Sequence, residues 1–222
     1  MFDARELIDL LIMGWMSNVP LAVGSVLTLA VFFDRITKFR GLEARSRELA
    51  SRVIETLTRP DLAGAKRLCE ESSIPLARIL GEALRWQNIA VEDYDRILGT
   101  LRAEAGTESR RGIWMIGTVG SLAPFVGLFG TVVGIIRAFG DLAQEGGGGG
   151  FELVAASLSE ALIATAAGLG VAIIALLLYN YLNTRVAALA STYARATERL
   201  GQAIIFVESR GASTGSSSDG LD

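Results

Sequence analysis

Three long stretches without a charged residue constrain what this 222-residue chain can fold into. They cover residues 10–33, 112–136 and 161–184, and they contain 24, 25 and 24 residues. An α-helix rises about 1.5 Å per residue, so about 20 apolar residues cross the hydrocarbon core of a bilayer. Each stretch therefore predicts a transmembrane helix, and we expect an all-α integral membrane protein.

The positions of the positive charges predict how these helices are oriented. Of the 21 Lys and Arg residues, 15 lie between residues 34 and 111, and four more follow residue 184. Only Arg5 and Arg137 lie elsewhere. Because cytoplasmic loops carry an excess of Lys and Arg, we expect the N-terminus outside and the C-terminus in the cytoplasm.

The segment between the first two spans has the pattern of a solvated helical bundle. It mixes 15 basic with 13 acidic residues, and its apolar residues recur at helical spacing. Pro60 and Pro75 indicate breaks between successive helices. The formal net charge of the chain is only −3, so composition does not favour nucleic acid as a partner.

These patterns divide the chain into eight segments that alternate between the membrane and its two sides. The glycine run at 146–150 predicts a flexible connector, and the last twelve residues have the composition of a disordered end. In order, the segments are a short outer N-terminus (1–9), a first transmembrane helix (10–33), a cytoplasmic helical segment (34–111), a second transmembrane helix (112–137), an outer Gly-rich loop (138–152), a third transmembrane helix (153–184), a cytoplasmic helix extension (185–209) and a disordered tail (210–222).

The residue types that are missing exclude several kinds of chemistry. The chain has no histidine, and Cys69 is its single cysteine. Cys/His zinc sites, histidine general bases and intrachain disulfides are therefore excluded. No P-loop spacing occurs either. We expect no enzyme activity, no catalytic residue, no metal site and no cofactor.

Glu160 stands at the head of the third span, on a helix face of small residues. An acid near the middle of a membrane helix costs about 2.5–3.5 kcal/mol and usually has a function. At a helix start near the interface, however, a carboxylate is mildly favoured, so both interpretations of Glu160 remain open. The small face comprises Ser157, Glu160, Ala161, Ala164, Thr165, Gly168 and Ala172.

The second span repeats this design. Gly120, Pro124, Gly127, Thr131 and Gly134 follow each other at three- and four-residue steps, so they share one helix face. Small residues on such a face let helices approach closely or line a cavity. We expect close packing of helices at these glycines and at Gly168, with Pro124 bending the helix.

Two runs resemble the paired signatures of the MotA/TolQ/ExbB proton-channel family, in its ExbB/TolQ branch. They are GSLAPFVGLFGTVVGIIRAF (120–139) and SEALIATAAGLGVAIIALLLYN (159–180). In the family, a proline usually follows the Ala-Ile of the third span, where this chain has Ile174. Residue by residue, the resemblance places the family's functional polar positions on Thr131, Glu160 and Thr165, which predicts an ion pathway there.

The resemblance also implies an assembly in the bacterial inner membrane. We expect a homopentameric ring around two copies of an ExbD/TolR-like single-span protein, whose membrane Asp takes and gives protons. We expect protons to be the coupling ion. Na⁺ is the less favoured ion, because the sequence shows no richer set of ligands for a metal ion. The driven process could be outer-membrane transport, Tol-type envelope maintenance or gliding motility. A structural scaffold without ion conduction is the alternative, and a self-sufficient ion channel is a weaker one.

Overall fold

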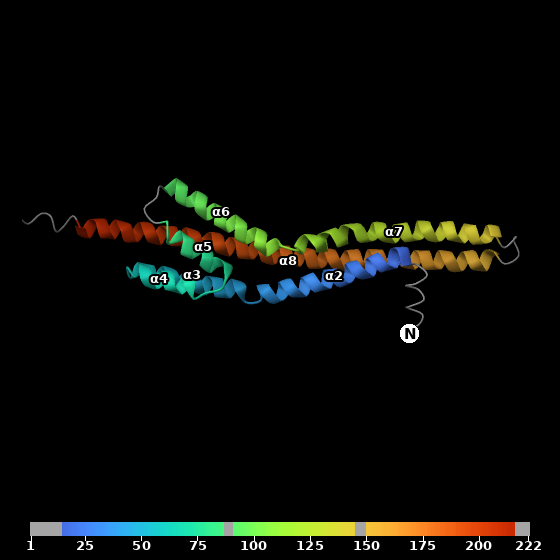
Figure 1. Ribbon diagram of the computed structural model, residues 1–222, viewed down its shortest axis with the longest axis horizontal. Coiled ribbons are helices and arrows are strands. Elements are labelled where there is room, and N and C mark those ends of the chain that lie inside the picture. Colours follow the sequence, from blue (N-terminus) through green and yellow to red (C-terminus); the bar gives the residue numbers. More distant parts are fainter. Residues whose placement is uncertain (1–14, 87–90, 145–149, 216–222) are drawn as a thin grey trace, which may run out of the picture. The chain divides into compact units, whose positions relative to one another are not determined.

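The computed structural model describes residues 15–86, 91–144 and 150–215 (Figure 1). Over these ranges the chain forms seven helices and no strand, which confirms the all-α prediction. The helices are α2 (Trp15–Phe39), α3 (Leu42–Thr58), α4 (Leu62–Glu70), α5 (Pro75–Ala83), α6 (Val91–Arg110), α7 (Ile113–Gln144) and α8 (Gly150–Gly215).

Three helical stretches are long and apolar enough to cross a membrane. They lie in Met16–Thr58, Ile113–Gly140 and Val154–Val207, and each overlaps one of the three uncharged runs. This agrees with the prediction of three transmembrane helices. α7 remains one helix through Pro124.

Several helix ends differ from the predicted segment boundaries. α7 continues to Gln144 and α8 begins at Gly150, so helix occupies much of the stretch expected as an outer loop. α8 continues to Gly215, beyond the expected start of the tail at residue 210. The predicted outer N-terminus, most of the glycine run and residues 216–222 lie outside the described residues.

The chain divides into two compact units. Residues 1–36 and 112–183 form the first, which holds the three apolar runs and is called the membrane unit below. Residues 37–111 and 184–222 form the second, called the bundle unit. α2 and α8 contribute residues to both units.

Two short turns separate the first helices of the bundle unit, where the sequence predicts breaks. α3 ends at Thr58, and Asp61 caps the start of α4 by accepting a hydrogen bond from the Gly64 amide at 2.8 Å. Such a cap satisfies an amide that has no partner within the helix. Pro75 occupies the first turn of α5, where the missing N–H costs nothing. The predicted breaks at Pro60 and Pro75 are confirmed.

Large apolar side chains form the core of the bundle unit. They come from α3, α4, α5, α6 and the part of α8 that follows residue 184. Burying one such side chain stabilises a fold by about 1.5–3 kcal/mol, so this core is the main source of stability for the unit. Its most deeply buried large members include Val53, Leu76, Ile79, Leu80, Leu84, Tyr193 and Leu200.

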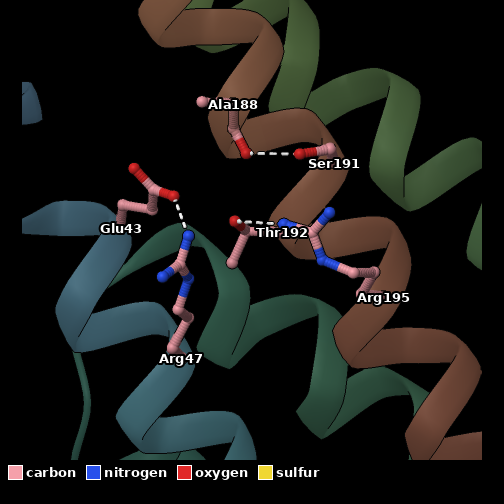
Figure 2. A network of polar contacts seen from close by, with 6 residues as sticks. All are labelled: Glu43, Arg47, Ala188, Ser191, Thr192 and Arg195. Atoms are coloured by element: carbon pink, nitrogen blue, oxygen red, sulfur yellow. Dashed lines mark hydrogen bonds and ion pairs between the residues drawn. The ribbon is translucent and has the colours of Figure 1, made fainter.

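Several polar contacts of the bundle unit join residues of the same helix (Figure 2). Arg47 pairs with Glu43 one turn earlier in α3. In α8, the Ser191 hydroxyl donates to the Ala188 carbonyl at 2.9 Å, and Arg195 donates to the Thr192 hydroxyl at 3.4 Å. Contacts at this spacing support a helix by only about 0.2–0.5 kcal/mol each. These contacts add little to the stability of the unit, which depends mainly on its apolar core.

Candidate ion-pathway site

Helices α7 and α8 approach each other closely at two glycines in the membrane unit. A Cβ atom added to Gly168 would lie 2.6 Å from the Ala123 carbonyl oxygen and 3.0 Å from the Gly127 Cα. A Cβ added to Gly127 would lie 3.0 Å from the Thr165 Cα. These neighbours are backbone atoms that cannot move aside, so glycine is needed at both positions for this helix separation.

The same contact continues along both helices. A Cβ on Gly134 would lie 2.5 Å from the Ala161 Cβ, and one on Gly120 would lie 3.0 Å from the Leu176 Cγ. Ala161, Ala164 and Ala172 are buried within the unit. Much of the small face of the third span therefore packs against α7 of the same chain.

Two threonine hydroxyls in this region bond to backbone carbonyls. The Thr165 hydroxyl of α8 donates to the Gly127 carbonyl of α7 at 2.8 Å. The Thr131 hydroxyl donates to the Leu128 carbonyl of its own helix at 2.7 Å, and this side chain is only 9% exposed. The first bond crosses between helices, and the glycine there lets the two backbones come near enough for it to form.

A pocket lined by both apolar and polar residues lies in the membrane unit, with its wall formed by α2, α7 and α8. Its volume is about 120 Å³, enough for several water molecules. Glu160 is half-buried and forms part of its wall. The lining residues are Met16, Ser17, Asn18, Phe129, Gly130, Val133, Gly134, Arg137, Ser157, Glu160, Ala161 and Ala164.

The pocket combines one acid, one base and several neutral polar groups. Among the described residues that line it, Glu160 and Arg137 carry charge. Ser17, Asn18 and Ser157 add side-chain oxygens, and Ser17 is almost fully buried. The Arg137 Nη2 lies 3.9 Å from the Met16 sulfur, so its guanidinium reaches the α2 wall. Such a pocket can hold water beside a carboxylate, which is what proton transfer through a protein needs.

The structure separates the predicted site residues into two groups. Glu160 and Gly134 line the pocket, whereas Thr131 and Thr165 do not. Gly120, Gly127 and Gly168 lie at the helix contact described above, and Pro124 is half-buried on the same face of α7. The ion-pathway role of Glu160, Thr131 and Thr165 stays a prediction.

Sequence reasoning missed the contributions of Arg137, Ser17 and Asn18 to this site. Arg137 served only to mark the end of the second span, and the two polar residues only interrupt the first apolar run. A polar residue inside a membrane span is itself a signal of function. The sequence does not say which other helix such a residue faces. Within the described ranges, no cluster of His, Cys, Asp and Glu suited to a metal ion was found.

Comparisons with known proteins agree with the sequence signatures. The family model described as the MotA/TolQ/ExbB proton channel family matches residues 71–195. A putative biopolymer transport protein ExbB-like 1 from Synechocystis is 32% identical over 180 residues, covering 80% of this chain and 70% of the relative.

Two further relatives carry the name biopolymer transport protein ExbB. The one from Salmonella typhimurium is 31% identical over 191 residues, covering 78% of this chain and 74% of the relative. The one from Neisseria gonorrhoeae is 50% identical over 72 residues, 32% of each chain. These relatives are named transport proteins and the matching family is one of proton channels, in agreement with the expectation that the chain is no enzyme. The chain is a multi-pass membrane protein that belongs to the MotA/TolQ/ExbB proton channel family, in its ExbB/TolQ branch.

Proposed function

We propose that this chain is the stator subunit of an ExbB/TolQ-type motor, which couples proton flow across the bacterial inner membrane to mechanical work on an envelope partner. The observation that carries the proposal is the pocket around Glu160, where Glu160, Arg137 and neutral polar side chains meet. It lies in a unit whose surface is otherwise rich in exposed apolar side chains such as Phe125, Ile136 and Leu177. Placing a carboxylate in such surroundings costs free energy, so a carboxylate that is kept there usually has a function.

The proposed assembly is a homopentamer around two copies of an ExbD/TolR-like single-span protein. The charge distribution supports a periplasmic N-terminus and a cytoplasmic C-terminus, because nearly all Lys and Arg residues lie in the bundle unit. A ring would place five Glu160 pockets around the partner's helices. The exposed apolar side chains of the membrane unit would then contact lipid and neighbouring subunits.

In this proposal Glu160 and the water beside it relay protons toward a carboxyl group of the partner. One charge that crosses the membrane releases about 2.3 kcal/mol per 100 mV, so a few protons can drive substantial movement. Thr131 and Thr165 would adjust the hydration of the path through their hydroxyl groups. In this structure both hydroxyls donate to backbone carbonyls. The subunit itself would make no covalent intermediate.

The test is proton uptake by proteoliposomes that contain the full chain co-purified with its single-span partner. Glu160→Gln removes the charge and keeps the shape, so we expect uptake driven by a membrane potential to fall to the background of empty vesicles. Glu198→Gln is the matched control, because Glu198 is an exposed acid elsewhere on α8. Normal uptake with Glu160→Gln would refute the role of Glu160.

The alternative is a scaffold that does not conduct ions. Both threonine hydroxyls are bonded to backbone carbonyls, as a purely structural role requires. A scaffold predicts uptake at the vesicle background for the wild type as well as for Glu160→Gln. It also predicts that combining Thr131→Ala with Thr165→Ala leaves the biological output intact.

Native mass spectrometry of the detergent-purified complex tests the assembly separately. The proposal predicts five copies of this chain and two of the single-span protein. A monomer or dimer without bound partner would refute the ring.

A further inference from the structure

We propose that Arg137 makes the Glu160 pocket selective for protons by excluding sodium ions, an inference that rests on the proposed ion pathway through this pocket. The sequence shows a single acid in the third span and no obvious ligand set around it. The structure brings other oxygen-bearing side chains to the same pocket, from two different helices. Selectivity therefore needs a cause that the acid alone does not supply.

The polar part of the pocket wall carries oxygen atoms of the kind that a hard cation binds, next to an apolar part formed by residues such as Met16 and Phe129. Ser17 and Asn18 come from α2, and Ser157 and Glu160 come from α8. Carboxylate, amide and hydroxyl oxygens are the ligands that hard cations take in proteins. The pocket volume of about 120 Å³ leaves room for an ion with some of its water.

Arg137, on α7, opposes a cation in this pocket in two ways. Its guanidinium stays charged at any ordinary pH and makes the pocket formally neutral when Glu160 is ionised. It also presents five N–H donors, which compete for the oxygens that a sodium ion would need. The contact of its Nη2 with the Met16 sulfur shows that these donors reach the wall that holds Ser17 and Asn18.

A proton avoids most of this competition. It binds one carboxylate oxygen of Glu160 covalently and moves along hydrogen-bonded water, so it needs no shell of several ligands. A sodium ion must exchange its water for pocket oxygens beside a fixed positive charge. Arg137 thus acts as a specificity-determining residue for the proposed ion pathway.

The experiment measures proton uptake by proteoliposomes holding the full complex, with NaCl replacing KCl at constant ionic strength. Two variants make the pocket more negative by one charge in different ways, namely Arg137→Gln on α7 and Asn18→Asp on α2. Arg137→Lys keeps the positive charge. Arg111→Gln is the matched control, since Arg111 lies between α6 and α7 and outside the pocket lining.

When about 100 mM Na⁺ replaces K⁺, proton uptake should change by less than about twofold in the wild type, Arg137→Lys and Arg111→Gln. Each of these proteins keeps a positive charge at residue 137, which repels Na⁺ and K⁺ alike. In both charge variants, the proton uptake measured in Na⁺ should be about fivefold or more below the uptake of the same variant in K⁺, because Na⁺ now occupies the pocket. If both charge variants stay insensitive to Na⁺, the inference is wrong.

The outcomes also separate this inference from the proposed function. If the wild type shows no proton uptake that depends on Glu160, the proposed pathway is refuted. The proposed selectivity is then refuted as well. A conducting wild type with Na⁺-insensitive charge variants would refute the role of Arg137 alone. If Arg137→Gln fails to assemble, Asn18→Asp decides the matter, because it leaves Arg137 and its contacts in place.

Discussion

In the bundle unit most large apolar side chains are buried, whereas in the membrane unit many large apolar side chains are exposed and many of the buried ones are alanines. Leu76, Ile79 and Leu80 are fully buried in the bundle. In the membrane unit the buried set includes Ala123 and Ala164, while Phe125 is 67% exposed and Leu177 is 64% exposed. The membrane unit buries a few large side chains such as Ile116 and Leu182, but it exposes many more of them than the bundle unit does.

The difference follows from the solvent that each unit meets. In water, burial of large apolar side chains drives folding, so these residues collect inside the bundle. In a bilayer the lipid tails are as apolar as leucine, and that driving force is lost between helices. Close backbone approach then holds helices together through dispersion and interhelical hydrogen bonds, and small residues allow it. Large side chains are free to face lipid or a neighbouring subunit.

The sharpest test of this comparison truncates one leucine in each unit. Leu80→Ala in the bundle should cost about 2–5 kcal/mol, because it leaves a cavity in a packed core. Leu177→Ala in the membrane unit removes an exposed side chain and should cost far less. Thermal unfolding of the detergent-solubilised chain measures both. Equal costs would show that the two units are stabilised in the same way.

The next test adds one methyl group at two glycines of α8. Gly168→Ala places a Cβ 2.6 Å from the Ala123 carbonyl oxygen, so we expect a loss of about 1–3 kcal/mol from overpacking. Gly170→Ala is the control, because its Cβ would meet nothing within 4 Å and alanine favours a helix. The same unfolding assay applies, and a tolerated Gly168→Ala would argue against backbone contact as the stabilising feature.

A smaller effect is expected from the hydrogen bond that joins α7 to α8. Thr165→Val keeps the shape of the side chain and removes the donor to the Gly127 carbonyl. Bonds of this kind between membrane helices contribute about 0.6 kcal/mol on average. Thr165→Ser should retain most of that stability. If both variants unfold alike, the bond contributes nothing measurable.

The smallest effect at neutral pH concerns Cys69 in the bundle unit. Burial, together with the charge of Glu70, raises the pKa of its thiol from 9.0 to about 11. At pH 8 we expect the folded chain to react with iodoacetamide about 100-fold more slowly than the unfolded chain, since two pKa units change the thiolate fraction by that factor.

The same pKa shift predicts how stability depends on pH. The unfolded thiol loses its proton first, so its contribution to stability is complete below pH 9 and declines as pH rises toward 11. Ala63→Cys in a Cys69→Ala background is the control, because residue 63 is exposed and its thiol should react quickly in the folded chain. Rapid alkylation of folded Cys69 would contradict the expected burial.

Much of the fold could be predicted from the sequence because the bilayer restricts the choices. Uncharged runs of this length leave helices as the natural way to satisfy backbone hydrogen bonds in lipid. The helix breaks at Pro60 and Pro75 followed from local backbone chemistry. The paired runs around Thr131 and Glu160 indicated the family, and the comparisons bear that out.

The composition of the site was decided by the tertiary structure. Helical periodicity shows which residues share a face of one helix, and it does not show which face of another helix they meet. That is why Glu160 could be singled out along the chain, while Ser17 of α2 and Arg137 of α7 could not be placed beside it. The small face of α8 had two open interpretations, and the contact of Gly127 with Gly168 shows that part of it packs within the subunit. Helix formation depends on neighbours in sequence, whereas a pocket depends on the separation and rotation of helices, which side-chain packing sets only in the folded chain.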